Sequence, residues 1–470
     1  MKPARGPAKI VILGGSYAGL SVAHQFLQKI IHTLGTTKTS PKYKVILVAP
    51  NTHLYWNIAG PRAICSAKLC PNKRAFVPFL PSFEMYPEEV FEFIQGEAIS
   101  VDFHQRTIDI DVIPNSGPAA KAFTTKVEEP PGPKVLDFHA LIIATGSAAH
   151  SDLLSLHGQH ERTIEALDTF RAGLVTASSI IIVGGGASGV ECAGQIATFV
   201  NRAKRKKAPG SNPKQSVCNK LHSLIRKDNA PAAAATPDGT NKPNTEPLNI
   251  TLISGSERLL PNLDEDLGEK AEKMLKALGV HIMHNVRLIS AQELPSRNTR
   301  CVLSDELTIS CDLFIAATGT SPNTAFLPEN LLDATGYVVV EPQFMRVPRA
   351  GDRVYAIGSC CAYDRKNILD VWAAVPVLLH NLRNDLWEWE IRVQNPYGGG
   401  EDKLEALQDV WFEPDERVTE LCPITRWGGV GVLYDYKLPG LAVWFLKGRD
   451  YGIKKAKKVV AYGSSPFPKK

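Results

Sequence analysis

The chain has 470 residues, which is too long for one ordinary domain and enough for two or three domains of roughly 150 residues each. Hydrophobic residues make up 44% and charged residues 21%, which excludes a largely disordered chain, a coiled coil and a collagen-like fibre. The net charge of +5 is unevenly distributed, because the first 83 residues carry eleven Lys and Arg and no acid, while the remainder has 42 basic against 48 acidic residues. The N-terminal cations are dispersed rather than clustered, so we expect no specific nucleic-acid partner.

The sequence has no apolar run of the eighteen or more residues that a membrane-spanning helix needs, and its N-terminus does not resemble a secretory leader. Nine cysteines, an odd number spread over a long chain, favour a reducing compartment over a disulfide scaffold. We therefore expect an intracellular, cytoplasmic protein, and we identify no metal-ligand cluster. The oligomeric state is left open.

Two stretches of the sequence show the order strand, glycine-rich turn, helix, strand. The first has a strand over Lys9–Leu13, a turn over Gly14–Gly19, a helix to about Ile31 and a strand over Tyr43–Val48. The second has a strand over Ser179–Val183, a turn over Gly184–Gly189, a helix to about Ala203 and a strand over Leu248–Ile253. Apolar strands with small-residue turns follow at Ala140–Gly146, Leu313–Gly319 and Val354–Ser359. Two nucleotide-binding units in one chain are a stronger signal than a single glycine motif.

The predicted fold class is α/β, with two Rossmann-like dinucleotide-binding domains, one inserted in the other, and a small α+β C-terminal domain. The third strand-turn suggests that the chain returns to the first domain after completing the second. We expect the first domain over residues 1–147 and 321–375, the second over 148–320 with a flexible insertion at 204–247, and the C-terminal domain over 376–470. A helix is expected near Leu267–Leu278, and strands over Gly431–Tyr436 and Leu441–Leu446.

In a Rossmann turn the first glycine allows a tight bend, the second lets the pyrophosphate approach the backbone, and the third allows close packing of helix on strand. The second turn has all three, at Gly184, Gly186 and Gly189, whereas the first has Ser16 at the middle position. An acid normally follows the second strand to bind the ribose. Here Ala49 stands at that position in the first unit and Ser254, with Arg258 four residues later, in the second. A hydroxyl and a guanidinium in place of an acid make NADPH at least as plausible as NADH.

On these motifs, the chain outside 204–247 resembles the pyridine-nucleotide-disulfide-reductase-like flavoproteins. Within them it is most similar to the ferroptosis-suppressor and apoptosis-inducing-factor-like branch (AMID-like), as found in fungi. The motifs that carry the resemblance are Val11–Gly19, Asn51–Asn57 with Arg62, Ile143–Gly146, Gly184–Glu191, Ala317–Asn323, Val354–Ser359 and Lys447–Asp450.

The resemblance implies that the first unit binds FAD and the second NAD(P)H, and that hydride passes from nicotinamide to flavin and on to a quinone. It places the following residues around the two cofactors: Gly14, Gly15, Ser16, Tyr17, Ala18, Gly19, Arg62, Ala98, Gly146 and Ser359 for FAD, and Gly184, Gly186, Gly189, Ser254 and Arg258 for NAD(P)H. Glu191 is implied to face the cleft where nicotinamide meets flavin, and Lys447 to stabilise the reduced flavin with its charge.

The sequence departs from the family pattern in one further place, because the third turn reads Gly358-Ser359 where Gly-Asp is usual. Together with Ala49, this removes two carboxylate contacts to FAD, so weaker flavin binding, or a paralogue that has lost the cofactor, stays open. Cys65 and Cys70 have the spacing of a redox dithiol but lack its flanking glycines, and we do not expect disulfide chemistry. Adjacent Cys360 and Cys361 should pack as a small apolar pair.

The sequence thus predicts an enzyme that passes hydride from NAD(P)H to FAD and electrons to a quinone-type acceptor. Two alternatives stay open: a flavin oxidoreductase acting on a specialised small molecule, and a catalytically impaired nucleotide-sensing or nucleic-acid-interacting paralogue. The C-terminal stretch Leu438–Leu446, followed by several Lys and Arg, suits either peripheral docking on an anionic membrane or a buried strand followed by a solvated basic helix. The mitochondrial outer membrane, or another membrane surface, is an alternative location by analogy alone.

Overall fold

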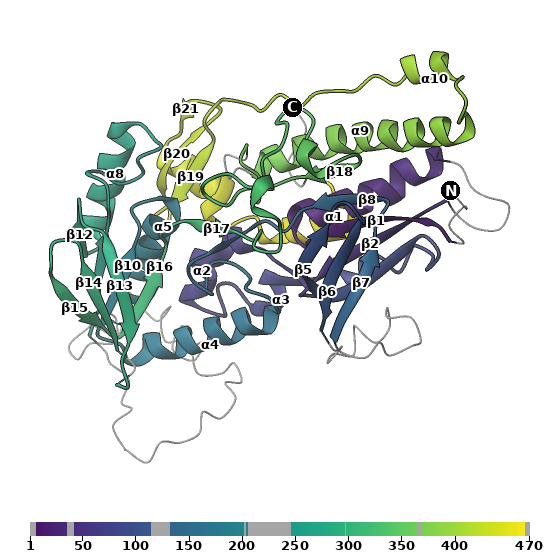
Figure 1. The fold of residues 1–470 in the computed structure, drawn as a ribbon. Helices are drawn as coiled ribbons and strands as arrows, with labels where there is room; N and C mark the ends of the chain where they lie inside the picture. The colour runs from purple at the N-terminus through teal and green to yellow at the C-terminus, as the bar shows by residue number, and fades with distance from the viewer. Residues whose placement is uncertain are drawn as a thin grey trace.

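The computed structural model describes residues 6–34, 42–113, 132–201, 204, 246–296, 298–363 and 368–465. Figure 1 shows two sheet-based units side by side, with the C-terminal segment across the top. The predicted insertion at 204–247 lies outside the described residues except at its ends. In the described part of the chain, no helix combines the length and the apolarity needed to cross a bilayer.

The first unit is built on a seven-stranded sheet. Its strand order is β18 (Val354–Ala356), β8 (Ala140–Ile143), β1 (Ala8–Leu13), β2 (Tyr43–Ala49), β5 (Phe91–Asp102), β6 (Thr107–Val112) and β7 (Gly132–Asp137). The first five are parallel to one another, whereas β6 and β7 pair antiparallel. The sheet carries a continuous apolar core because β1, β2 and β8 are buried on both faces, as parallel strands usually are.

The second unit has a four-stranded parallel sheet in the order β12 (Val280–Met283), β11 (Asn249–Ile253), β10 (Ser179–Val183) and β16 (Leu313–Ala316). A separate antiparallel sheet follows, formed by β13 (Leu288–Glu293), β14 (Thr299–Leu303) and β15 (Thr308–Cys311). Between the units, β9 (Ser147–Ala149) pairs antiparallel with β17 (Thr320–Pro322), so the chain leaves the first unit and returns to it along one two-stranded ribbon. Because β18 joins the first sheet after that return, the second unit is inserted in the first, and the predicted α/β fold class is confirmed.

Helices cover both sheets. The helices that follow the two glycine turns are α1 (Tyr17–Gln25), extended by η1 (Phe26–Ile30) and η2 (Ile31–Thr33), and α5 (Ala187–Ile196), extended by η6 (Ala197–Asn201). The others are η3 (Asn57–Ala59), α2 (Gly60–Cys65), α3 (Asn72–Ala75), η4 (Leu80–Ser82), α4 (His160–Thr176), α8 (Glu265–Ala277), η7 (Glu329–Leu331), η8 (Pro348–Ala350), α9 (Ile368–Gln394) and α10 (Glu401–Glu405), with the short hairpin of β3 (His53–Tyr55) and β4 (Phe76–Pro78). The long helix α9 packs on α1, and Figure 1 shows it along the top of the first unit.

In the C-terminal segment, the strand predicted over Gly431–Tyr436 is confirmed only up to Leu433, where a turn leads into a second short strand, and the strand predicted over Leu441–Leu446 is wrong. Strands β19 (Glu420–Pro423), β20 (Gly429–Leu433) and β21 (Tyr436–Lys437) form a small antiparallel sheet. The predicted strand Leu441–Leu446 is helical, within α11 (Gly440–Val443) and η9 (Trp444–Gly448), and η10 (Ile453–Lys455) and α12 (Ala456–Tyr462) follow. Pro439 starts this helix, and a six-residue apolar run cannot be assigned to strand or helix by periodicity alone.

Candidate functional site

The first glycine turn connects β1 to α1 and is tightly packed against β8. Gly14 has a φ of +117°, and a Cβ atom on it would lie 2.2 Å from the carbonyl oxygen of Ala144. A Cβ atom on Gly19 would lie 1.8 Å from the carbonyl oxygen of Gly14. Both positions therefore require glycine, the first for its backbone conformation and the second for the contact between helix and turn.

The second glycine turn repeats this geometry. Gly184 has a φ of +125° and a Cβ atom on it would lie 2.1 Å from the carbonyl oxygen of Ala317, while the corresponding distance from Gly189 to the carbonyl oxygen of Gly184 is 1.9 Å. The two units thus build the same strand-turn-helix junction, each against the alanine carbonyl of an Ala-Thr-Gly turn. A duplication of backbone geometry is stronger support for two nucleotide sites than the sequence motif alone.

The middle position of each turn leaves room in front of a helix N-terminus. Ser16 and Gly186 are the N-cap residues of α1 and α5, and the Ser16 hydroxyl makes no capping hydrogen bond to its helix. A Cβ atom on Gly186 would meet no other atom within 4 Å. The open cradle and the amides of the first helical turn suit a pyrophosphate, so the residues present fit a dinucleotide at each turn.

Small residues lie under both turns at the carboxyl ends of the second strands. A Cβ atom on Gly15 would be 2.8 Å from Ala49 Cβ, and one on Gly185 would be 2.4 Å from Ser254 Oγ. Ser254 is buried, and its hydroxyl donates to the carbonyl of Ser256 at 3.1 Å. The usual acid is absent from both units, and the Ser254 hydroxyl is already held by its own loop.

Arg258 is also held by its loop. Its Nη1 donates to the carbonyl of Leu263 at 2.7 Å and its Nη2 to the carbonyl of Pro261 at 2.8 Å. The guanidinium therefore stabilises the 258–263 segment. Because two of its nitrogens donate to backbone carbonyls, the Arg258 side chain is neither fully solvated nor free to bind a phosphate group.

Three turn ends of the first unit meet beside α1. A Cβ atom on Gly358 would lie 3.4 Å from Ala18 Cβ, and the Ser147 hydroxyl donates to the Ser359 hydroxyl at 3.1 Å. Gly146, with a φ of +69°, lies in the same place, since a Cβ atom on it would be 3.6 Å from Ser359 Oγ. The structure thus brings Ala18, Gly146 and Ser359 together at the carboxyl edge of the first sheet.

Tyr17 and Ala98 occupy different surroundings. The Tyr17 hydroxyl donates to Asn57 Oδ1 at 2.9 Å, and its ring lies edge-on to Trp56 with 5.7 Å between centroids. Tyr17 therefore connects the first turn to the 51–57 motif. Ala98 lies further along β5, opposite Ile110 and next to a bulge, where it packs against an apolar cluster of the first unit.

The two predicted catalytic residues, far apart in sequence, form an ion pair. Lys447 Nζ lies 2.5 Å from Glu191 Oε1 and also donates to the carbonyl of Leu421 at 2.9 Å. The Glu191 side chain is 3% exposed and that of Lys447 25%. Burial raises the pKa of Glu191 above its ordinary value, and Lys447 opposes part of that rise. The pair therefore joins a buried carboxyl on α5 to a partly exposed ammonium from the C-terminal segment.

Two buried oxygens beside this pair face each other and have no other hydrogen-bond partner among the described residues. They are Glu191 Oε2 and the Tyr451 hydroxyl. The charge of Glu191 contributes to raising the pKa of Tyr451, although burial is the larger cause, so the two groups lie within electrostatic reach of each other. Unsatisfied buried oxygens are rare in folded proteins and fit a site that receives a polar ligand or a proton.

Arg62 lies in this cluster. Its Nε donates to Gln195 Oε1 at 2.8 Å, its Nη2 donates to the carbonyl of Gly448 at 2.9 Å, and its guanidinium stacks on the Tyr451 ring. These contacts differ from the diphosphate contact that the resemblance implied. Arg62 connects the first unit, through α2, to α5 and to the C-terminal segment.

Cys65 and Cys70 are both buried and free. Burial raises the pKa of the Cys65 thiol to about 12 and that of the Cys70 thiol to about 11. Neither thiol is therefore an activated thiolate at neutral pH. Cys360 and Cys361 are buried in the apolar core of the first unit, as predicted.

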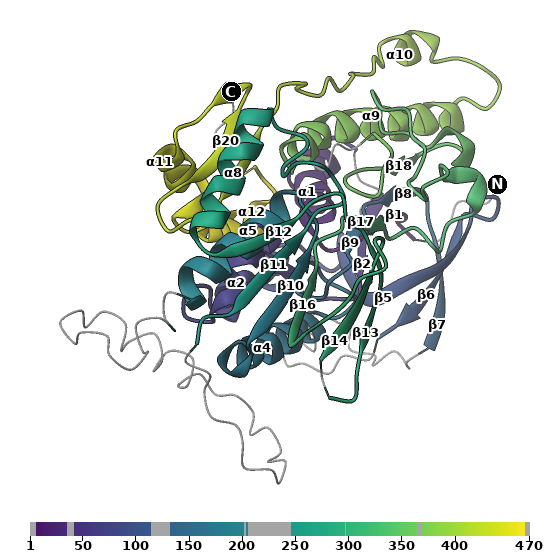
Figure 2. The same cartoon turned by 90° about the vertical axis from the view of Figure 1, so that its left-hand side faces the viewer.

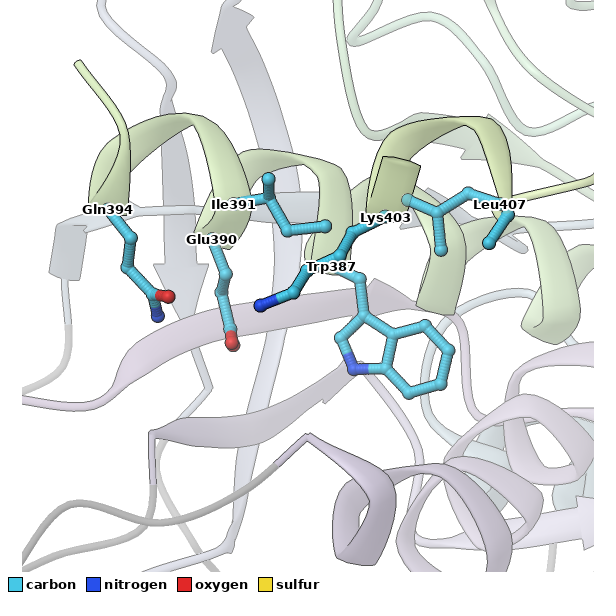
Figure 3. A pocket seen from close by; sticks show the side chains of 7 residues that line it. Trp387, Glu390, Ile391, Gln394, Lys403 and Leu407 are labelled. Atoms are coloured by element: carbon cyan, nitrogen blue, oxygen red, sulfur yellow. The ribbon is translucent and has the colours of Figure 1, made fainter. Parts of the chain in front are cut away.

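A pocket of about 290 Å³ lies between the end of α9 and α10, away from these residues (Figure 3). It is lined by Trp387, Glu390, Ile391, Gln394, Lys403, Ala406 and Leu407. Glu390 is already bound to the hydroxyl of Tyr43 and to Lys42. The pocket contains none of the predicted site residues, and we assign no function to it.

Three residues near the candidate sites were missed from the sequence. Gln195 and Tyr451 belong to the Glu191 cluster, and Arg287 lies beside the loop that follows β11. Gln195 was detectable in principle, because it lies four residues after Glu191 and so on the same face of α5. Tyr451 directly follows the Lys447–Asp450 motif. No sequence signal identifies Arg287.

Comparison with known proteins supports the interpretation of the two turns. The family model described as pyridine nucleotide-disulphide oxidoreductase matches residues 8–376. The oxidoreductase phnG of Penicillium herquei is 31% identical over 450 residues, which cover 94% of this chain and 93% of phnG. Ferroptosis suppressor protein 1 of Mus musculus is 22% identical over 76% of this chain and 74% of its own length. The solved structure of the sulfide:quinone oxidoreductase from Aquifex aeolicus has a TM-score of 0.58 and 12% identity, and the match covers 97% of this chain and 92% of that one.

Proposed function

The chain belongs to the pyridine nucleotide-disulphide oxidoreductase family, and from this premise we propose that it is a FAD-dependent enzyme that oxidises NAD(P)H and reduces a quinone-type acceptor. The observation that carries the proposal is the duplicated turn, in which Gly14 and Gly184 both have a positive φ and both lie too close to the segment after the neighbouring strand for any residue with a Cβ atom. Within the family, the motifs and the similarity to ferroptosis suppressor protein 1 support a place among the ferroptosis-suppressor-like members.

We assign FAD to the first unit and NAD(P)H to the second. The first turn has three neighbouring segments that supply polar groups, with Ser16, Gly146 and Ser359 at one sheet edge. Their hydroxyl and backbone groups would hold the diphosphate and ribityl chain in place of the usual carboxylates. The second turn, with its open cradle at Gly186, would hold the pyrophosphate of the nicotinamide cofactor.

Bound FAD would supply the two-electron chemistry that links oxidation of the nicotinamide to reduction of the acceptor. Glu191 and Lys447 act next to that exchange. Glu191 Oε2, buried next to the Tyr451 hydroxyl, can orient a carboxamide or hold a proton, because burial raises the pKa of this carboxyl. The Lys447 ammonium supplies a fixed positive charge where negative charge develops.

Anaerobic spectroscopy tests the proposed function. The purified protein should carry a flavin absorption band that bleaches when NADH or NADPH is added and returns when a soluble quinone follows. Recovery with oxygen but not with quinone would contradict the acceptor assignment. A colourless protein that does not take up added FAD would contradict the flavin assignment and favour the nucleotide-sensing alternative.

Substitution of Arg62 separates its structural contacts from a role in flavin binding. Arg62→Met removes the bonds to Gln195 and Gly448 and should lower the free energy of unfolding by about 2 kcal/mol. The flavin-to-protein ratio should stay that of the wild type. Thermal melting and the visible spectrum measure the two effects. Loss of flavin at an unchanged melting temperature would assign Arg62 to the diphosphate instead.

An apolar surface on the C-terminal segment supports docking on a membrane that holds a lipid quinone. Four large side chains are exposed: Trp427 by 55%, Leu441 by 65%, Phe445 by 60% and Leu446 by 45%. Arg426 stacks on Trp427 and Arg449 on Phe445, so cations border the apolar groups. We propose that this surface binds an anionic membrane from the cytoplasmic side.

Vesicle flotation tests this docking surface. The wild-type protein should float with vesicles that contain phosphatidylserine. Phe445→Glu should reduce the floating fraction at least about fivefold, because a carboxylate replaces an exposed aromatic ring and repels the lipid charge. Ile289→Glu is the matched control, since Ile289 is 67% exposed on β13 of the second unit. Equal loss in both variants, or no flotation of the wild type, would contradict membrane docking.

A further inference from the structure

The loop after β11 is where a Rossmann unit distinguishes NADH from NADPH, by an acid for the ribose hydroxyl or a cation for the 2′-phosphate. Neither predicted residue is free for that task. The Ser254 hydroxyl bonds to the Ser256 backbone, and the Arg258 guanidinium bonds to two backbone carbonyls. A third residue at the same sheet edge has its cationic group available.

That residue is Arg287, which follows β12. Since β12 is the parallel neighbour of β11, the segments that follow the two strands lie side by side at the carboxyl edge of the sheet. The amide of Val286 donates to the carbonyl of Ser254 at 3.0 Å, and the amide of Asn285 donates to the carbonyl of Ser256 at 3.2 Å. The two loops are therefore fixed to each other by backbone hydrogen bonds.

The Arg287 side chain lies across Gly255. A Cβ atom on Gly255 would be 3.1 Å from Arg287 Cγ and 3.6 Å from Arg287 Nε. Because residue 255 has no side chain, the Arg287 side chain can pack directly against the backbone of the loop that follows β11. On its other side, the Arg287 amide donates to the hydroxyl of Ser304 at 3.0 Å, which fixes the backbone from which the side chain extends.

The Arg287 guanidinium is an exposed cation without a carboxylate partner in the part of the chain that the structure describes. The only acid between residues 254 and 258 is Glu257, which is exposed. The Arg287 guanidinium therefore has no ion-pair partner among the described residues, and the loop beside it has a serine in place of the ribose-binding acid. Such a guanidinium complements a phosphate group in charge and in hydrogen-bonding geometry.

We propose that Arg287 binds the 2′-phosphate of NADPH and makes the enzyme prefer NADPH over NADH. The inference rests on the proposed function, and it assigns the selectivity to a residue after β12 instead of to Arg258. Ser254 contributes because it replaces the usual acid, whose negative charge would repel the 2′-phosphate.

The test measures ligand binding directly, with the flavin-containing full-length protein. Calorimetric titration with adenosine 2′,5′-bisphosphate and with adenosine 5′-monophosphate compares a ligand that has the 2′-phosphate with one that lacks it. The wild type should bind the bisphosphate about ten- to a hundredfold more tightly, and Arg287→Gln should abolish most of that ratio. The ratio of kcat/KM for NADPH over NADH should fall by the same factor.

Arg300→Gln is the matched control, because it removes one exposed arginine from β14 of the same unit. It should keep the wild-type ratio of affinities. Equal binding of the two ligands by the wild type, or an unchanged ratio in Arg287→Gln, would overturn the inference while leaving an NAD(P)H oxidoreductase in place. Binding of neither ligand, together with no oxidation of NADH or NADPH, would overturn the proposed function itself.

Discussion

Replacement of Lys447 by methionine is expected to lower the turnover of NAD(P)H with a quinone about a hundredfold. An effect of this size is expected when a group that stabilises developing negative charge and holds the Glu191 carboxylate is removed. Methionine keeps most of the side-chain volume but leaves the Glu191 carboxylate buried without its cation. The pKa of Glu191, already raised by burial, should rise further, so a larger fraction of this carboxyl is protonated at any given pH than in the wild type. Stopped-flow absorbance at the flavin band measures the rate.

The same variant has a pH signature in its stability. A carboxyl whose pKa is higher in the folded than in the unfolded state loses stability as pH rises from the unfolded pKa, about 4.3, through the folded one. The free energy of unfolding of Lys447→Met should therefore be about 2 kcal/mol lower at pH 8 than at pH 5. This is a little less than the loss expected for a fully buried pair, because Lys447 is partly exposed. The double variant Glu191→Gln with Lys447→Met should remove this pH dependence. Wild-type turnover and a flat pH profile in Lys447→Met would contradict a role of the pair in catalysis and in stability.

Substitutions at the second turn are expected to separate folding from cofactor binding. Gly184→Ala places a Cβ atom 2.1 Å from the carbonyl oxygen of Ala317 at a φ of +125°, so the turn must open. We expect a loss of about 3 kcal/mol or more in the free energy of unfolding, with little folded protein recovered. Circular dichroism melting and the yield of monodisperse protein measure this.

Gly186→Ala is the matched change two residues away. The added methyl group meets no protein atom within 4 Å, so the melting temperature should stay within a few degrees of that of the wild type. The methyl group occupies the cradle at the N-terminus of α5, and the affinity for NADH and NADPH should fall at least about tenfold. Unchanged affinity in a well-folded Gly186→Ala protein would contradict the position of the pyrophosphate.

The sequence predicted those parts of the fold that depend on local residue patterns. Gly14 and Gly184 each follow a short apolar strand, and such a junction is recognisable because the strand, the bend and the helix are contiguous in the chain. The functional roles expected for Glu191 and Lys447 had a different source, since they came from the resemblance to a family, and their ion pair was not predicted. Spacing alone could not have supplied it, because 256 residues separate the two side chains.

The predictions that the structure changed depend on surroundings that a linear pattern does not contain. Leu441 and Phe445, four residues apart, lie on one face of a helix that exposes them, and their apolar character alone suggested a strand. Arg258 was predicted to lie near a ribose because it follows the end of β11 by a few residues. In the folded loop, its guanidinium donates hydrogen bonds to the carbonyls of Pro261 and Leu263 instead. Every residue has a backbone carbonyl, so residue types alone do not predict which carbonyls will accept a side-chain hydrogen bond.

The insertion of one unit in the other sets an order for folding during synthesis. The second unit is one continuous stretch of the chain, and its parallel sheet is complete once β16 has been made, whereas the first sheet lacks its edge strand β18 until after that point (Figure 2). The first unit must therefore close a long loop around an already folded neighbour. Lys447 and Tyr451 leave the ribosome later still, so a nascent chain forms both glycine turns before the Glu191 carboxyl receives its cation. The residues of both glycine turns are thus synthesised well before the Glu191–Lys447 ion pair can form.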